Sequence, residues 1–122
     1  MKLLLLAFTL AAAMMAQTTA PKMVKYYMGF LKKGPNCSSH SAAENAEIQK
    51  GHLAHLGRMH EMGKLVVAGP FGDNGEIRGI LVFRGKDSLE DLKKLAEDDP
   101  AVKAGRMVVE LHPWYVQDGV LP

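Results

Sequence analysis

Runs of apolar residues alternate with polar segments along the chain in a pattern that predicts four strands and two helices. Four short runs rich in β-branched, aromatic and aliphatic side chains have the composition of strands: residues 24–31, 65–68, 77–83 and 107–111. Two other segments carry apolar residues at helical spacing: residues 42–62 and the segment that follows Ser88. The polar stretches between them contain glycine and proline, as turns do.

Capping residues indicate where the first helix begins and ends. Ser41 followed three residues later by Glu44 is a capping-box pattern, which places the start of the helix at residue 42. Gly63 is expected just past the other end, because glycine accepts the left-handed conformation that follows many helices. Gly51 and Gly57 weaken the interior of this helix, since glycine has a low helix propensity.

The second half of the chain has its own boundary signals. Residues 73–75 (Asp-Asn-Gly) predict a tight turn, and Ser88 is the expected N-cap of the second helix. Asp99-Pro100 either ends that helix or begins a short turn, and residues 112–115 are expected to close the domain. The resulting order, β-α-β-β-α-β, is that of the ferredoxin-like α+β fold, which we place at residues 23–116.

The predicted strands are apolar on both faces. Two helices cover only one face of such a sheet, so the other face of an ordinary antiparallel sheet should be polar. In residues 80–83 and 107–111, however, most side chains are apolar. An exposed apolar face needs a cover, and a second copy of the chain is the simplest one. The sequence therefore predicts a homodimer with sheet packed on sheet.

Composition and charge exclude several classes of protein. The chain has 122 residues, enough for one small domain, and its 48% apolar content is enough for a core. With 15 Lys or Arg against 13 Asp or Glu, the formal net charge is +2 and no basic stripe stands out, so nucleic acid is not an expected partner. No Gly-x-Gly-x-x-Gly or Walker motif is present, and no cofactor is expected.

The first residues have the layout of a secretory signal peptide. A basic start at Lys2 precedes an apolar run, which small residues and a short polar stretch follow. The run is shorter than the roughly 20 residues that span a bilayer. We expect cleavage after Ala16, with Ala13 and Ala20 as alternatives, and assign residues 1–16 to the signal peptide. The mature protein would then be periplasmic or secreted, without a membrane anchor; the alternative is a buried N-terminal helix.

Thiol and metal chemistry are weaker possibilities for a site. In an oxidising compartment Cys37 either stays free or pairs between chains, because the chain has no second cysteine. His52 and His55 are three residues apart and have no adjacent glutamate, unlike the H-E-x-x-H arrangement that binds zinc on a helix. No metal site is therefore predicted.

His52 is the candidate for the reacting group. With about 100° of rotation per residue, Ile48, Leu56 and Met59 lie within about 40° of His52 around the first helix, so its ring points at the sheet. An inward imidazole needs partners, because an unpaired buried polar group costs about 1–3 kcal/mol. Either His52 is a satisfied core histidine, or a carboxylate fixes its tautomer for proton transfer.

Asp73, Arg78 and His55 complete the predicted site. The second strand leaves the first helix directly, so the turn that carries Asp73 could return over the earlier helical turns and meet His52. A His–Asp pair of this kind suits proton abstraction or donation. Arg78 and His55, which lies on the margin of the apolar stripe, are then predicted to contact the substrate. The alternatives are an ordinary turn for Asp73 and a solvated strand residue for Arg78.

Several short motifs, taken in order, resemble the YCII-related family of small dimeric α+β barrel proteins. They are His52-Leu53-Ala54-His55-Leu56, Gly63-Lys64-Leu65, Ala68-Gly69-Pro70-Phe71 with Asp73, Asp99-Pro100 with Gly105, and Glu110 near Pro113-Trp114. The resemblance covers residues 23–116. It implies a ferredoxin-like protomer whose sheets pair into a dimer. It also implies a His–Asp active-site pair, which His52 and Asp73 would match here.

The resemblance leaves two hypotheses for function. A relative of the family acts as a dehydrochlorinase or lyase on a ring derived from chlorinated aromatics, which implies a small-molecule site. The first hypothesis is a lyase or isomerase acting on a small cyclic or anionic compound, with His52 as general base or acid and Asp73 as its orienting carboxylate. The second is a non-catalytic binding or stress-related module that holds a ligand in the dimer cleft.

Overall fold

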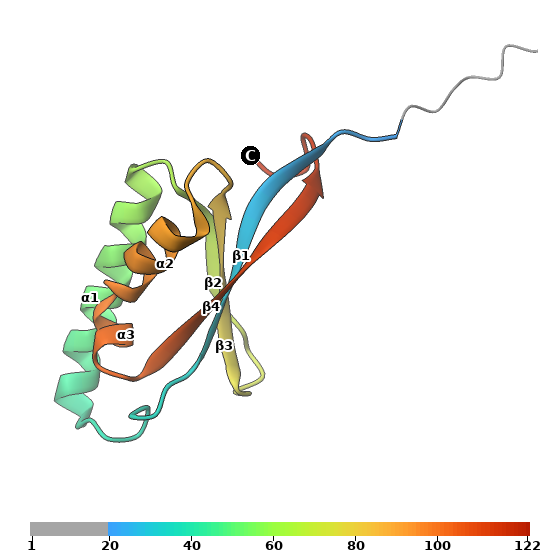
Figure 1. The fold of residues 1–122 in the computed structure, drawn as a ribbon. Helices are drawn as coiled ribbons and strands as arrows, with labels where there is room; N and C mark the ends of the chain where they lie inside the picture. Colours follow the sequence, from blue (N-terminus) through green and yellow to red (C-terminus); the bar gives the residue numbers. More distant parts are fainter. Residues whose placement is uncertain (1–19) are drawn as a thin grey trace, which may run out of the picture.

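The computed structural model describes residues 20–122, which form a four-stranded antiparallel sheet with helices on one side (Figure 1). In chain order the elements are β1 (Met23–Lys33), α1 (Ala42–Glu61), β2 (Leu65–Pro70), β3 (Ile77–Arg84), α2 (Leu89–Glu97), α3 (Pro100–Lys103) and β4 (Met107–Gln117). The strand order is β2-β3-β1-β4, which confirms the predicted ferredoxin-like α+β fold. The predicted signal peptide, residues 1–16, lies outside the described residues.

The helix boundaries follow from the capping residues. Ser41 Oγ accepts a hydrogen bond from the Glu44 amide at 3.1 Å, and Ser88 Oγ accepts one from the Asp91 amide at 3.1 Å. Each serine thereby satisfies a backbone donor that has no partner within its helix. After α1 the chain turns at Gly63, whose φ is +73°. These contacts confirm the predicted starts of α1 and α2.

α1 continues without a break through Gly51 and Gly57. A Cβ on Gly57 would meet nothing within 4 Å, but one on Gly51 would lie 2.9 Å from Cγ and 3.2 Å from Cβ of Pro100. Only glycine allows α3 to approach α1 so closely at this point. Because His52 follows Gly51 and Asp99 precedes Pro100 in sequence, the same packing brings His52 next to Asp99.

β4 is longer than the sequence predicted. We expected the strand to end at residue 111 and residues 112–115 to close the domain, but β4 continues to Gln117. The added residues pair with the first half of β1, from Met23 opposite Gln117 to Met28 opposite His112. β4 is an edge strand, and there a proline, which has no N–H, is tolerated. The unpaired edge of β1 therefore decided the length of β4.

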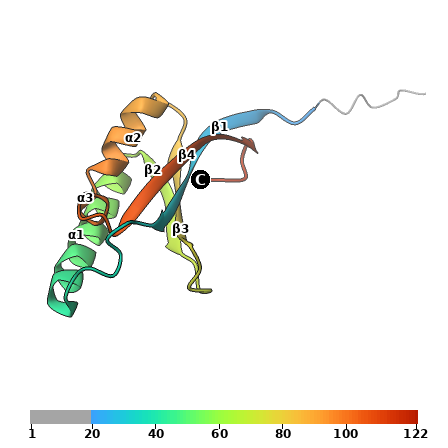
Figure 2. The same cartoon turned by 60° about the horizontal axis from the view of Figure 1, so that its bottom comes forward.

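The three helices of residues 20–122 cover the same face of the sheet, and the other face carries none (Figures 1 and 2). The core between sheet and helices consists of Tyr27, Leu31, Met59, Leu65, Leu81, Phe83, Leu92 and Ala96. Alternate residues of the strands point to the opposite side, which we call the helix-free face. There the rings of Phe30 and His112 meet edge to face with centroids 6.0 Å apart, and Val108 is 42% exposed. This is the face from which the sequence predicted a dimer, and it carries the Lys32–Glu110 ion pair beside its apolar side chains.

Candidate active site

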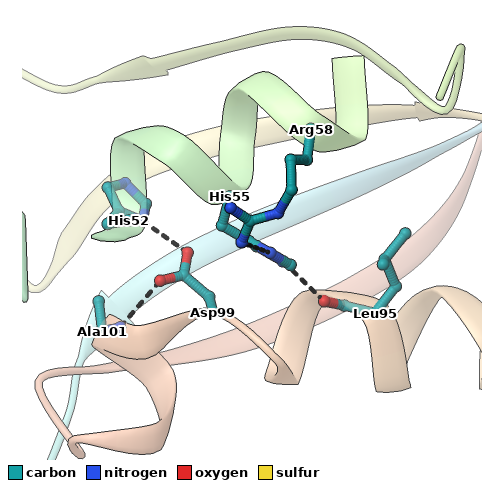
Figure 3. A network of polar contacts seen from close by, with 6 residues as sticks. All are labelled: His52, His55, Arg58, Leu95, Asp99 and Ala101. Atoms are coloured by element: carbon teal, nitrogen blue, oxygen red, sulfur yellow. Dashed lines mark hydrogen bonds and ion pairs between the residues drawn. The ribbon is translucent and has the colours of Figure 1, made fainter. Parts of the chain in front are cut away.

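The buried histidine of α1 has a carboxylate partner, but not the one that was expected. Only 7% of His52 is exposed, and its Nδ1 lies 2.5 Å from Oδ2 of Asp99 (Figure 3). Asp99 stands between α2 and α3, far along the chain from the turn that carries Asp73. The expected partner of His52 is therefore corrected from Asp73 to Asp99.

Asp99 is held in place as the N-cap of α3. Its Oδ1 accepts a hydrogen bond from the Ala101 amide at 2.8 Å, and the residue is 2% exposed (Figure 3). This leaves Oδ2 for His52. Because a carboxylate oxygen only accepts, the imidazole donates its Nδ1–H, and the lone pair of the ring resides on Nε2. The contact thus selects one tautomer of His52 and orients its ring.

A cavity of about 530 Å³ lies beside His52. His52 lines this cavity together with other residues of α1, such as Gln49 and Leu53, while Leu31 and Leu81 line it from the sheet. Within residues 20–122, Nε2 of His52 has no hydrogen-bond partner. This nitrogen is nevertheless not sealed from solvent. Cavities of this size commonly hold small ligands. A ligand there could exchange a proton with Nε2.

The wall of the cavity is cationic. Lys33, Arg78 and Arg106 line it, and none of its lining residues is Asp or Glu. Arg78 lines the same cavity as His52, and its role as a substrate contact stays a prediction; Lys33 and Arg106 were not identified from the sequence. No local pattern marks Lys33 and Arg106, because the three cations come from separate strand ends that only the sheet brings together.

Asp73 lies outside this cavity. It is exposed in the turn between β2 and β3, where its Oδ1 accepts a hydrogen bond from the Gly75 amide at 3.2 Å. The predicted contact with His52 is not formed: Asn74 of the same turn lines the cavity, but Asp73 does not, and Asp99 takes the place beside the imidazole. A catalytic role for Asp73 stays a prediction without a contact to His52 behind it.

His55 also lies outside the cavity and connects two helices instead. It is 4% exposed, its Nε2 donates to the Leu95 carbonyl at 2.8 Å, and its Nδ1 lies 3.4 Å from a guanidinium nitrogen of Arg58 (Figure 3). With both ring nitrogens engaged, His55 fastens α1 to α2. The structure does not bring it to the position of a substrate contact.

Three further features of residues 20–122 complete the description of the site and its surroundings. No group of three or more His, Cys, Asp or Glu side chains in residues 20–122 is arranged to hold a metal ion. Cys37 is free and lines the cavity, with its sulfur 3.7 Å from Ser38 Oγ. Among the helices that the structure describes, none has the length and apolar composition needed to cross a membrane.

Comparisons with known proteins place this geometry in context. The family model described as the YCII-related domain matches residues 25–115. Among solved structures, the chain is similar to 5-chloro-2-hydroxyhydroquinone dehydrochlorinase (TftG) from Burkholderia phenoliruptrix AC1100, solved in complex with 2,5-dihydroxybenzoquinone. The TM-score is 0.53 at 21% sequence identity, and the match covers 73% of this chain and 92% of that one. None of the curated proteins compared with the chain matches it.

Proposed function

The chain belongs to the family of proteins with a YCII-related domain, and we propose that it is an enzyme that moves a proton on a small anionic compound with His52. The observation that carries this proposal is the contact between His52 Nδ1 and Asp99, which leaves Nε2 accessible from a cationic cavity. A general base needs an open lone pair within reach of its substrate, and this arrangement supplies one. In the proposal Asp99 is a positioning residue that holds the ring and stabilises the imidazolium.

The reaction that suits this site is a lyase or isomerase reaction. Nε2 takes a proton from an acidic carbon of the substrate, and the negative charge that develops there is stabilised by Arg78 or Arg106. In a lyase reaction the electron pair of the broken C–H bond then forms a double bond and a leaving group departs with its own electron pair. In an isomerase reaction Nε2 returns the proton to a different atom. The lyase form has support from the solved relative, which is named as a dehydrochlorinase.

A second candidate function is a binding module that uses the same cavity without turnover. The observation in its favour is that His52 has no acidic companion in the cavity, whose lining contains no Asp or Glu. A substrate that must be protonated and deprotonated at two atoms would have to use His52 for both steps. In this second function the cations hold an anionic ligand, and His52 donates or accepts a hydrogen bond only.

We further propose that the protein works as an exported homodimer. The helix-free face carries apolar side chains, Val108 among them, that a second copy would cover by packing sheet on sheet. Export rests on the signal-peptide pattern of residues 1–16 and leads to a periplasmic or secreted protein. The dimer is tested by light scattering on the purified protein, and export by N-terminal sequencing, which should begin near Gln17.

The enzyme proposal is tested by comparing His52→Asn with a matched variant on the same helix. The protein is incubated with a panel of halogenated and hydroxylated cyclic carboxylates, and chloride release and changes in absorbance are followed. His52→Asn should lower turnover by about 10²- to 10⁴-fold, the usual contribution of a general base. His60→Asn is the control, because His60 is exposed and contacts only the Leu65 carbonyl, at 3.1 Å. Equal turnover by wild type and His52→Asn would reject the catalytic assignment.

A further inference from the structure

Three cations form a row across one end of the sheet. Arg78 lies at the start of β3, Lys33 at the end of β1 and Arg106 immediately before β4. β1 stands between β3 and β4, Lys33 is opposite Met107 of β4, and the Lys33 amide donates to the Glu76 carbonyl at 3.0 Å. The three side chains therefore start from neighbouring strands at about the same level, and all three line the cavity.

No carboxylate among residues 20–122 neutralises this row. None of the ion pairs in that part of the chain includes Lys33, Arg78 or Arg106. Neutral oxygens orient the arginines instead: Arg78 Nη1 donates to Asn74 Oδ1 at 2.7 Å, and Arg106 Nη1 donates to Asn45 Oδ1. A guanidinium has five N–H donors, so each arginine keeps donors for a ligand.

Some lysines elsewhere in residues 20–122 have anionic partners, whereas Lys25, Lys50 and Lys86 have none. Lys32, next to Lys33 but on the opposite face of the sheet, pairs with Glu110, and Lys64 pairs with Asp87 at 2.9 Å. In the row, Arg78 and Arg106 are partly buried and Lys33 is exposed, and all three line one cavity without a carboxylate partner. Like charges repel most strongly where water is partly excluded, so an anion bound there would relieve that repulsion. We therefore expect the ligand to be negatively charged.

We propose that the cavity takes a ligand with two acidic groups at opposite ends, one bound by Arg78 and the other by Arg106. This deepens the proposed function and rests on its cavity. Neighbouring strands lie about 4.8 Å apart, so the backbones of β3 and β4, with β1 between them, are separated by about 10 Å. Such a separation favours acidic groups that are far apart in the ligand. Arginine suits each end because its guanidinium pairs with a carboxylate through two parallel hydrogen bonds.

The probes that test this proposal are benzoate and two benzene dicarboxylates. Terephthalate carries its carboxylates on opposite sides of the ring, and phthalate carries the same two charges on adjacent carbons. Calorimetric titration of the full chain should show terephthalate binding at least about tenfold more tightly than either of the others, because it alone engages both arginines. Equal affinity for terephthalate and benzoate overturns the proposal. Equal affinity for terephthalate and phthalate also overturns it, since charge alone would then explain binding.

Substitution of each arginine tests whether it binds one of the two acidic groups of the ligand. Arg78→Gln and Arg106→Gln should each remove the preference for terephthalate, while benzoate, which keeps one arginine in either variant, should lose less than about threefold. Arg84→Gln is the control, because it changes the net charge equally and its Nη1 contacts the Pro122 carbonyl at 2.9 Å, outside the cavity. Arg106 also links a loop to α1 through Asn45, so its variant is checked for folding by circular dichroism. If it does not fold, Arg78→Gln decides, and a retained preference there refutes the proposal.

The same experiment separates this inference from the proposed enzyme. The arginine variants report on the preference for terephthalate, and His52→Asn reports on turnover, so the two proposals are read from different measurements. Turnover that depends on His52 without a preference for terephthalate would leave the enzyme proposal intact and reject the ligand class. A preference that depends on both arginines, with no turnover dependent on His52, would retain the ligand class and reject the enzyme.

Discussion

Replacing Gly51 by alanine perturbs the packing that joins His52 to Asp99 without touching either side chain. The new Cβ would lie 2.9 Å from Cγ of Pro100, whereas comfortable contact between carbon atoms begins near 3.5 Å. The ring of Pro100 closes on its own backbone, so α3 has to move away from α1 by roughly 0.6 Å or more, the difference between those two distances. Asp99, the N-cap of α3, moves with it, and its 2.5 Å contact with His52 lengthens.

The matched control for this variant is Gly57→Ala. Both glycines lie inside α1, and both substitutions gain about 0.5–1 kcal/mol of helix propensity. A Cβ on Gly57 meets nothing within 4 Å, so that variant should simply become more stable. Gly51→Ala also overpacks against Pro100, which typically costs about 1–3 kcal/mol. The difference between the two variants therefore isolates the packing of α3 on α1.

Urea unfolding of the two variants and of wild type measures this difference directly. We expect Gly57→Ala to exceed wild type in free energy of unfolding, and Gly51→Ala to fall below Gly57→Ala by about 1–3 kcal/mol. The NMR signal of the His52 Nδ1 proton should move in Gly51→Ala only, because its hydrogen bond to Asp99 lengthens there. Equal stabilisation by both variants, with an unmoved His52 signal, would refute the reasoning.

Three further outcomes follow from individual contacts. Asp99→Asn should keep the cap of α3 but allow the Asn Nδ2 group to donate a hydrogen bond to the His52 ring, which favours the other tautomer of His52. Enzyme activity should then drop by about 10²-fold or more, and normal turnover would argue against a positioning role for Asp99. Hydrogen bonds from Lys32 and then His112 hold the pKa of the exposed Glu110 below its usual 4.5, so its stabilising effect is present above pH 4.5 and is lost as the pH falls below that value. Melting curves should show the difference in Tm between wild type and Glu110→Gln shrinking on acidification, and a constant difference would contradict this origin. Phe30→Asp places a charge on the helix-free face and should convert the proposed dimer to a monomer in light scattering, whereas an unchanged mass would reject sheet-on-sheet pairing.

The elements of the fold could be predicted from the sequence because their signals are local. Ser41 and Ser88 cap the helices that follow them, and Gly63 adopts the positive φ that was expected just past α1. The length of β4 was not predictable in the same way. Residues 112–115 begin with His and Pro and look like a closing segment, but β1 offers an unpaired edge to the chain as far as Gln117. Strand pairing between distant segments, rather than propensity, extended the strand.

The candidate site shows the same division between local and distant information. That His52 points inward follows from helical spacing, and the need for a partner follows from the cost of burying an unpaired imidazole. The choice of partner did not follow. Asp73 was chosen because its strand comes directly after α1, whereas Asp99 is 47 residues from His52 along the chain. An Asp-Pro pair is also a common helix start, with proline in the first turn. That signal could have marked Asp99 as a candidate partner of His52.

By itself, the sequence determined α1, α2, the four strands and their order along the chain, and the inward direction of His52, because each depends on residues within a few positions of one another. The short helix α3 and the full length of β4 were not predicted. The tertiary structure alone decided which carboxylate meets His52 and which cations surround the cavity. Gly51 lets Pro100 pack against α1, which carries Asp99 to the imidazole. The pairing of β3, β1 and β4 brings Arg78, Lys33 and Arg106 to one wall. Contacts of this kind depend on how the elements pack, and packing depends on shape across the whole chain rather than on local pattern.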